Sequence, residues 1–337
     1  MMQTEQKLLF SIIVPVYNRR QELKELLESL VRQTHRDFEV VIVEDGSQDA
    51  SKDVVEKFDE VLRITYLFKE NSGPGLSRNY GMQHASGNYF IILDSDVILP
   101  ENYMEIVRYE LEQNYVDVYG GPDAAAQDFT PTQKAINYAM TSIFTTGGIR
   151  GKVQSLEKFH PRSFNMGISK QVFKKTQGFS PMRFGEDIDF SIRIFSEGFK
   201  SRLIPSAYVF HKRRNTIRQF FKQVYNSGIA RINLYKRHPK SLKTVHFFPA
   251  IFTLSLLAMT LIFIFVCKYA LLPFFLYFIL LFIDASIKNK SILIGAYSAL
   301  MSFVMLMGYG LGFMQAFWMR ILLKRQEFSS FEKTFYK

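Results

Sequence analysis

Short apolar runs alternate with helix-like patterns in the part of the chain that precedes residue 245. The runs at residues 8–16 and 38–43 are almost continuously apolar, which is typical of strands buried on both faces of a sheet. Strands are predicted at residues 8–16, 38–43, 63–68 and 89–93, and helices at residues 23–31, 54–58 and 77–85. This alternation predicts an α/β domain with a mostly parallel, doubly wound sheet and right-handed crossovers.

A second pattern begins near Phe247, where long apolar stretches replace the alternation. Residues 247–266 give 20 positions without a charge, residues 269–283 give 15, and residues 291–319 give 29. About 20 apolar residues suffice to cross a bilayer as a helix. The sequence therefore predicts an all-α transmembrane region of about three helices at residues 246–323.

The orientation of this region stays open at the level of the sequence. Three crossings would place Lys324 and Arg325 on the side opposite the N-terminal domain, which the positive-inside rule disfavours. Either the second apolar segment, which contains Pro273, or the third, which its glycines would break, is then re-entrant.

Positive charge concentrates between the two patterns. The net charge is +11, residues 200–243 carry twelve Lys and Arg, and residues 198–283 contain no Asp or Glu. Ile217 and Val224 belong to one apolar helix face, so residues 216–245 are predicted to form an amphipathic interfacial helix and a basic linker. The alternative is a basic helix packed on the globular domain. Membrane lipids or a pyrophosphate are the expected partners, and nucleic acid is not.

Cys267 is the single cysteine, so no internal disulfide forms, which fits a reducing compartment. The first seven residues are polar and give no indication of a signal peptide. We expect a globular domain at residues 1–215, the interfacial segment at 216–245, the membrane region at 246–323 and a polar tail at 324–337.

Polar and acidic residues follow the predicted strands. Tyr17 and Asn18 follow the first strand, Asp45 the second, and Asp94 and Asp96 the fourth. Ligands of doubly wound sheets bind at the carboxyl ends of the strands, so these side chains are expected at one edge. Carboxylates there would repel a bare phosphate, and the sequence has no GxGxxG or GxxxxGKS/T loop. The pattern indicates a cation between carboxylates and phosphate.

Four short motifs occur in order along the chain. They are Ser11-Ile-Ile-Val-Pro-Val-Tyr-Asn18, Glu44-Asp-Gly-Ser47, Leu93-Asp-Ser-Asp96 and Gly185-Glu-Asp-Ile-Asp189. Together they resemble the family 2 glycosyltransferases, which are inverting enzymes. The resemblance covers residues 8–235 and implies a Rossmann-like GT-A catalytic domain that uses a nucleotide-diphospho-sugar.

Asp94-Ser-Asp96 resembles the DxD motif of that family. The resemblance implies that Asp96 binds Mg²⁺ or Mn²⁺ and that Asp94 contacts the ribose or a metal-bound water. Such a cation would offset the repulsion of the diphosphate and neutralise the leaving group. The alternative is an ordinary Asp-rich turn at a strand end. His211 is the second candidate for the metal or pyrophosphate, with a purely structural histidine as its alternative.

A larger set of residues is implied to bind the donor nucleotide. By resemblance it comprises Pro15, Tyr17, Asn18, Asp45, Arg78, Asn79 and Asp94. The carboxylate of Asp45 matches the position that accepts a hydrogen bond from the base. Uracil and guanine both present such a ring N–H, so UDP- and GDP-sugars are the expected donors. The alternative for Tyr17 is that it simply packs at the end of a strand. The alternative for the loop before Arg78 is a turn that caps a helix.

Glu186 and Asp187 resemble the acidic pair of the family. Inverting transfer needs a base that removes the proton of the attacking hydroxyl. Asp187 is predicted to be this base because a like charge beside it raises its pKa, and Glu186 is predicted to support it or bind the acceptor. Alternatively, the negative charges of these residues only stabilise the N-terminus of a helix through its dipole. Asn165 and Gly167 lie in a segment that resembles the acceptor side.

The expected function is therefore metal-dependent, inverting, non-processive glycosyl transfer in surface polysaccharide or glycolipid synthesis. The QxxRW motif of processive relatives is absent, since Gln223 is followed by Val-Tyr-Asn. The apolar region predicts a lipid-linked saccharide or polyprenyl phosphate as acceptor. It also predicts a multi-pass protein of the plasma (inner) membrane with a cytoplasmic catalytic domain. A nucleotide-sugar-forming nucleotidyltransferase and an inactive membrane scaffold are the alternatives.

Overall fold

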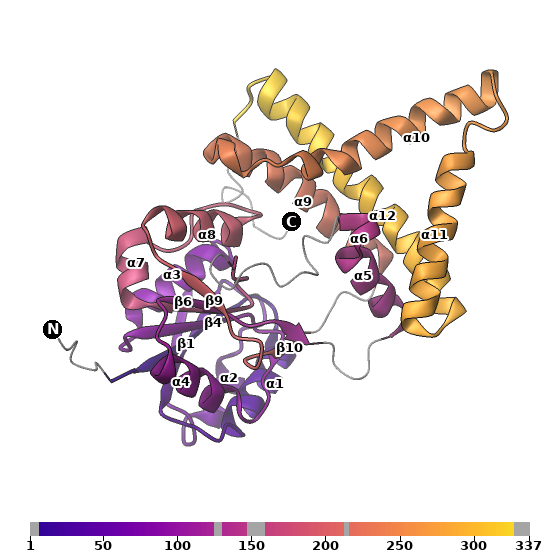
Figure 1. Cartoon of the computed structure of the whole chain (residues 1–337). Helices are drawn as coiled ribbons and strands as arrows, with labels where there is room; N and C mark the ends of the chain where they lie inside the picture. The colour runs from indigo at the N-terminus through magenta and orange to yellow at the C-terminus, as the bar shows by residue number, and fades with distance from the viewer. Residues whose placement is uncertain (1–6, 125–129, 147–158, 212–215, 327–337) are drawn as a thin grey trace. The chain divides into compact units, whose positions relative to one another are not determined.

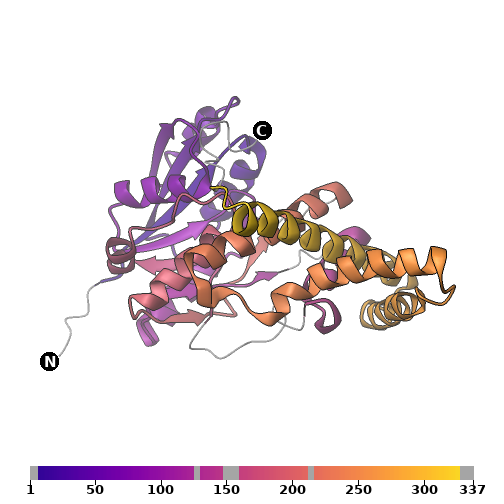
Figure 2. The same cartoon turned by 90° about the horizontal axis from the view of Figure 1, so that it is seen from above.

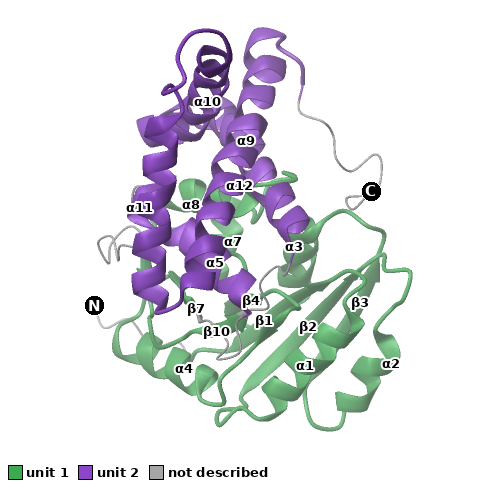
Figure 3. Ribbon diagram, turned by 90° about the vertical axis from the view of Figure 1, so that its right-hand side faces the viewer, with its two compact units in different colours: residues 1–126, 154–212, 329–337 green, residues 127–153, 213–328 purple. Residues whose placement is uncertain are grey.

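The structure is a computed structural model that describes residues 7–124, 130–146, 159–211 and 216–326. The chain divides into two compact units (Figure 3). The first comprises residues 1–126, 154–212 and 329–337, and the second residues 127–153 and 213–328. The second unit thus includes an internal segment of the predicted globular domain. The predicted limits at residues 215, 245 and 323 remain a proposal.

Seven strands form the main sheet of the first unit, in the order β3-β2-β1-β4-β8-β6-β9. Figure 1 labels β1, β4, β6 and β9 among them. Their bounds are β1 Phe10–Val16, β2 Phe38–Asp45, β3 Ile64–Lys69, β4 Tyr89–Leu93, β6 Val118–Gly120, β8 Asn165–Ser169 and β9 Ser201–Leu203. β8 runs antiparallel to β4 and β6, and the other pairs are parallel. The predicted α/β class with a mostly parallel sheet is confirmed.

A second, three-stranded sheet has the order β5-β10-β7. Its strands are β5 Val97–Ile98, β7 Asp123–Ala124 and β10 Val209–His211. β5 begins directly after Asp96, and its pairing with β10 aligns Val97 with His211. This small sheet therefore brings the backbone of His211 beside the end of the DxD-like segment.

Helices cover both faces of the main sheet. They are α1 Arg20–Val31, α2 Lys52–Val55, α3 Pro74–His84, α4 Tyr103–Gln113, α7 Lys170–Thr176 and α8 Glu186–Ser196, with a 3-10 turn at Glu56–Phe58. Alternate residues of each strand face opposite cores. Ile12 and Val40 pack with α1 and α4 in one core, while Ile13 and Val41 pack with α3, α7 and α8 in the other.

The second unit is entirely helical in its described residues (Figure 2). Its helices are α5 Pro131–Thr141, α6 Ile143–Thr146, α9 Ile217–Arg237, α10 Phe248–Phe265, α11 Leu272–Asn289 and α12 Ile292–Phe317, with 3-10 turns at Pro239–Ser241 and Thr244–Phe247 and a π-helical turn at Trp318–Leu322. Three segments are long and apolar enough to cross a membrane, namely Thr244–Phe265, Leu272–Asn289 and Ile292–Leu322. The prediction of three apolar helices is confirmed.

The glycines of α12 do not break it, contrary to the expectation from the sequence. The helix continues through Gly308, Gly310 and Gly312. A Cβ atom added at Gly312 would lie 2.1 Å from the carbonyl oxygen of Tyr225 in α9, and one at Gly310 would lie 2.4 Å from that of Pro249 in α10. These glycines therefore admit the backbones of two neighbouring helices, as small residues do where membrane helices pack closely.

Candidate active site

The carboxyl ends of three strands meet at one edge of the main sheet, because β1 pairs in parallel with both β2 and β4. Tyr17 and Asn18 follow β1, Asp45 ends β2, and Asp94 follows β4. The fold thus gathers the strand ends that the sequence analysis singled out.

Arg78 of α3 connects two acidic segments that lie far apart in the sequence. Its Nη2 donates to Oδ1 of Asp94 at 2.6 Å, and its Nη1 lies 3.4 Å from Oε1 of Glu186. The side chain is only 3% exposed and stacks on Phe179, with the guanidinium carbon 5.2 Å from the ring centroid. Burial lowers the pKa of Arg78, but Asp94 and Glu186 outweigh this effect and raise it. A buried, charged arginine therefore bridges the DxD-like segment and the Glu186–Asp187 pair.

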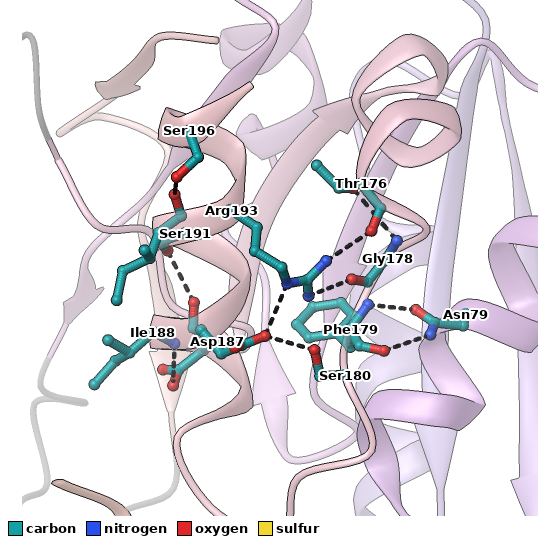
Figure 4. A network of polar contacts seen from close by, with 12 residues as sticks. Asn79, Thr176, Gly178, Phe179, Ser180, Asp187, Ile188, Ser191, Arg193 and Ser196 are labelled. Atoms are coloured by element: carbon teal, nitrogen blue, oxygen red, sulfur yellow. Dashed lines mark hydrogen bonds and ion pairs between the residues drawn. The ribbon is translucent and has the colours of Figure 1, made fainter. Parts of the chain in front are cut away.

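Glu186 and Asp187 open α8, directly after Gly185, whose φ of +83° suits a residue without a side chain. Oδ2 of Asp187 accepts a hydrogen bond from Nη1 of Arg162 at 2.9 Å. Its Oδ1 accepts one from the backbone N–H of Ile188 at 2.8 Å (Figure 4). The two carboxylates thus contact different arginines, Glu186 facing Arg78 and Asp187 facing Arg162.

The pKa values of the two carboxylates shift in opposite directions. Burial and the neighbouring charge of Asp187 raise the pKa of Glu186 to about 7. Burial opposes ionisation of Asp187 as well, but the Arg162 guanidinium outweighs it and lowers the pKa of Asp187. The prediction that a like charge raises the pKa of Asp187 is therefore wrong. The charge of Arg162 dominates at Asp187, and the raised pKa belongs to Glu186.

Asp96 lies at the start of the small sheet, with Oδ2 3.9 Å from Nη1 of Arg19 and its side chain 20% exposed. Within the four described stretches of the chain, no three His, Cys, Asp or Glu side chains gather as a metal centre. The side chain of His211 lies outside the described residues. Mg²⁺ is commonly held by one or two carboxylates together with substrate phosphates and water. The partly exposed oxygens of Asp94 and Asp96 fit such an ion, which would take its other ligands from the substrate and water.

Asp45 is occupied by groups of the protein itself. Its Oδ1 accepts from Nζ of Lys69 at 2.6 Å and from the backbone of Ser72, and its Oδ2 accepts from the backbone of Gly73 and from Asn71. A carboxylate offers about four acceptor positions, so a nucleotide base would have to displace one of these donors. In this geometry Asp45 holds the loop that leads into α3, and its contact with the base stays a prediction.

The loop after β1 is fixed to the loop after β2. The backbone N–H of Asn18 donates to Oγ of Ser47 at 2.7 Å, and Oδ1 of Asn18 accepts from the backbone of Gln48. Asn18 also has a positive φ of 50°, a conformation that Asn tolerates better than most residues. Pro15 is buried within β1, and Tyr17 is half-buried. The predicted nucleotide-binding loop is thus held at the edge of the sheet, and its contact with a nucleotide stays a prediction.

Asn79 is held by the backbone of Phe179. Its amide donates to the carbonyl oxygen of Phe179 and accepts from the N–H of Phe179, both at 2.8 Å (Figure 4). Arg193 holds the same segment through the carbonyl oxygens of Thr176 and Gly178. Asn79 therefore anchors α3 to the chain that precedes α8, and its contact with a nucleotide stays a prediction.

Asn165 and Gly167 of β8 lie in the interior, contrary to their predicted contact with the acceptor. Asn165 is fully buried, accepts a hydrogen bond from the hydroxyl of Tyr103 at 2.6 Å and donates one to the carbonyl oxygen of Ala207 at 2.8 Å. A Cβ atom at Gly167 would lie 1.9 Å from the ring of Tyr119. Both residues are thus required by packing, because a central strand passes close to large buried tyrosines.

Arg162 and Lys69 contact the predicted acidic residues, yet no sequence pattern singled them out. Each is a single basic residue without a motif of its own. Their roles follow only from the tertiary pairing of distant segments.

Comparison with known proteins shows what this domain is similar to. The model of the family described as Glycosyl transferase family 2 matches residues 11–177. The mannosyltransferase PcManGT from Pyrobaculum calidifontis, solved in complex with GDP-Man and Mn²⁺, superimposes with a TM-score of 0.63 at 15% identity. That match covers 94% of this chain and 89% of that chain. At this identity the likeness shows the fold alone.

Curated relatives agree with this class over part of their length. Glycosyltransferase GlyA of Streptococcus pneumoniae serotype 4 is 38% identical over 112 residues, which are 33% of this chain and 16% of GlyA. The putative teichuronic acid biosynthesis glycosyltransferase TuaG of Bacillus subtilis is 35% identical over 138 residues, which are 40% of this chain and 54% of TuaG. Residues 11–177 thus match glycosyl transferase family 2, in agreement with the motifs, and the likeness to PcManGT shows a shared fold.

Proposed function

We propose that this protein transfers a single sugar, with inversion, from a nucleotide-diphospho-sugar to a lipid-linked saccharide or polyprenyl phosphate. The observation that carries the proposal is the contact of buried Arg78 with both Asp94 and Glu186. This contact joins the segment of Asp94, which would face the diphosphate, to the Glu186–Asp187 pair, which would face the acceptor. Inverting transfer needs a leaving group and a base on opposite sides of one carbon, held in place together.

On the donor side, Asp96 and the segment of His211 would hold Mg²⁺ or Mn²⁺. When bound, the ion would neutralise the charge that develops on the leaving diphosphate. Asp94 would contact the ribose or a metal-bound water, since Arg78 fixes its orientation. The nucleotide would lie along the loop of Tyr17 and Asn18, which is held at the same edge of the sheet.

On the acceptor side, Asp187 would act as the base. Arg162 keeps its pKa low, so Asp187 is ionised at neutral pH and able to accept a proton. Its two hydrogen bonds, from Arg162 and from Ile188, leave acceptor positions of the carboxylate for the hydroxyl of an acceptor. Glu186 would hold the acceptor or support Asp187 from the side of Arg78.

The acceptor class is supported by the apolar helices of the second unit. A lipid-linked acceptor lies in a membrane, where these helices would keep the enzyme. The bound ligands of PcManGT, GDP-Man and Mn²⁺, support a nucleotide-sugar donor and a divalent ion. The name of TuaG supports a role in the synthesis of a surface polysaccharide. We place the protein in the plasma (inner) membrane with its catalytic domain in the cytoplasm.

The proposal is tested with the full chain in detergent, Mn²⁺ and a panel of UDP-, GDP- and dTDP-sugars. One donor should give slow release of nucleoside diphosphate. Asp187→Asn should lower transfer by about 10²- to 10⁴-fold, the usual contribution of a general base, while donor binding persists. Asp59→Asn, at an exposed aspartate, is the matched control and should transfer as the wild type does. Exchange of pyrophosphate would indicate a nucleotidyltransferase. No turnover with any donor would indicate an inactive scaffold. Either result overturns the proposal.

The metal is tested separately through Asp96→Ala. This variant should lose the dependence of donor binding on Mn²⁺, measured by calorimetry with and without the ion. Binding that depends on Mn²⁺ as in the wild type would remove Asp96 from the metal site.

A further inference from the structure

Helix α9 and the C-terminal half of α12 run side by side in the same direction. Oη of Tyr225 contacts Gln315, Asn233 accepts a hydrogen bond from Arg320, and Lys236 donates to the carbonyl oxygen of Arg320. These partners are 90, 87 and 84 positions apart. Because the separation in sequence between contacting residues stays nearly constant, the two helices are parallel. Close packing at the glycines of α12 extends this contact toward the N-terminus of α9.

The polarity of α9 does not suit the interior of a bilayer. Arg218 and Lys222 are exposed residues of α9. With offsets of 84 to 87, they lie level with residues 302–309 of α12, the middle of the apolar segment Ile292–Leu322. If α12 crossed the bilayer along its length, both charges would lie near the bilayer centre, where Lys and Arg are strongly disfavoured.

Helices α10 and α11 differ from α12 in what surrounds them. Only 22% of the apolar window of α10 and 11% of that of α11 is buried within the protein, against 50% for α12. Large apolar side chains such as Leu257, Ile264 and Phe275 are about 60% exposed or more. Such a surface is suited to lipid on all sides, whereas α12 is half covered by other helices.

The start of α10 and the end of α12 lie at the same level. The rings of Phe247 and Phe313 are 5.3 Å apart, and Ala250, Ala316 and Ile232 share one apolar cluster. Lys240 and Lys243, which precede α10, therefore lie at the same end of the unit as Lys324 and Arg325, which follow α12. The positive-inside rule favours this placement, whereas three crossings would separate the two groups.

We infer that α9 and residues 302–322 form a platform that lies in the lipid headgroup layer, and that α10 and α11 alone cross the bilayer as a hairpin. The exposed basic residues of α9 then face water and anionic headgroups, and exposed Trp318 lies at the interface that tryptophan prefers. The inference concerns membrane binding by the second unit and does not depend on the proposed catalysis.

The test uses Cys267, the single cysteine, which is exposed in the turn between α10 and α11. A membrane-impermeant maleimide is applied to membrane vesicles of known orientation that contain the full chain. Cys267 should react from the side opposite Lys240. In the Cys267→Ser background, the single variants Lys240→Cys, Lys290→Cys and Lys324→Cys should all react from one shared side.

Each alternative gives a distinct result that overturns the inference. Reaction of Lys324→Cys from the side of Cys267 would mean three crossings. Reaction of Cys267 from the side of Lys240 would mean that the hairpin does not cross. Lys222→Cys should react from the side of Lys240; protection in vesicles but reaction in detergent would place α9 in hydrocarbon. The four lysines chosen for substitution, Lys222, Lys240, Lys290 and Lys324, are exposed. Cys267 is labelled in the wild-type chain without any substitution. Arg325→Cys provides a second labelling site after α12.

Discussion

Replacement of Arg162 by Gln tests the electrostatics of the site most directly. Nη1 of Arg162 lies 2.9 Å from Oδ2 of Asp187, and its charge outweighs the effect of burial on that carboxylate. Gln retains a hydrogen-bond donor but has no charge. Burial, which opposes ionisation, would then act on Asp187 without this counterweight, and its pKa would rise.

The size of the effect follows from the distance and the exposure of the pair. An opposite charge within about 4–6 Å lowers the pKa of an Asp by about 1–3 units. The side chain of Arg162 is 39% exposed, so water screens part of its charge. We therefore expect the acid limb of the rate profile to move up by about 1 pH unit, the lower end of that range.

The assay is kcat/KM for nucleoside diphosphate release as a function of pH, since this quantity reports the ionisation of the free enzyme. A base works only when it is ionised, so activity falls as the pH falls through its pKa. A raised pKa moves that fall to higher pH, and the rate on the alkaline plateau changes less. Arg202→Gln is the matched control, because Arg202 pairs with Glu110 at 2.8 Å outside the acidic cluster.

An unchanged profile for Arg162→Gln would refute this reasoning. A lower rate at every pH, with the same midpoint, would mean that Arg162 binds a substrate and does not tune Asp187. A shift of equal size in Arg202→Gln would mean that the effect comes from the net charge of the domain.

Three further changes probe the acidic pair, the helix packing and the interior. Glu186→Gln should remove an inflection of kcat/KM near pH 7, because the raised pKa of about 7 belongs to Glu186. Gly312→Leu should destabilise the helical unit by about 1–3 kcal/mol in thermal unfolding, since its side chain has no room beside Tyr225. Asn165→Ala should lower the free energy of unfolding by about 1–3 kcal/mol, because buried Tyr103 loses its hydrogen-bond acceptor.

A neighbouring position provides the control for Gly312→Leu, and the other two variants each have an outcome that contradicts the prediction. Leu311→Ala alters an exposed residue beside Gly312 and should leave the unfolding temperature nearly unchanged. An inflection that persists in Glu186→Gln would assign the titration to another group. A stable Asn165→Ala protein with weakened acceptor binding would restore the contact that was first predicted for Asn165.

The strands with the clearest sequence signal were predicted best. β1, β2, β3 and β4 lie within two residues of the predicted limits, and β1, β2 and β4 are compact, largely apolar runs. β6 and β9 are only three residues long, and β8 contains Gly167. Such strands are specified by pairing with distant neighbours, which periodicity does not reveal.

The site was predicted in part for a related reason. Motifs located the acidic segments, and the sheet brings their strand ends to one edge. The partners of the carboxylates were not foreseeable, because Arg162 and Lys69 come from segments without a motif. Asn79 and Asn165 occur beside functional motifs, yet their amides complete hydrogen bonds of the interior. A motif specifies which residue is present, whereas burial decides whether its side chain faces a ligand or the core.

The ion pairs of the first unit change the argument for a metal. From the sequence, a cation is predicted because clustered carboxylates would repel a bare phosphate. In the structure Lys69, Arg78, Arg162 and Arg19 contact these carboxylates, so the protein already supplies much of that compensation.

What the protein does not balance is the added negative charge of a diphosphate. Under the proposed function, a divalent ion would therefore offset the charge of the substrate more than that of the carboxylates. One or two partly exposed aspartates would then be a sufficient protein contribution, with phosphate oxygens and water completing the ligand set. Under this account, Arg78 has a different task from the metal: it fixes Asp94 and Glu186 relative to each other before any substrate binds.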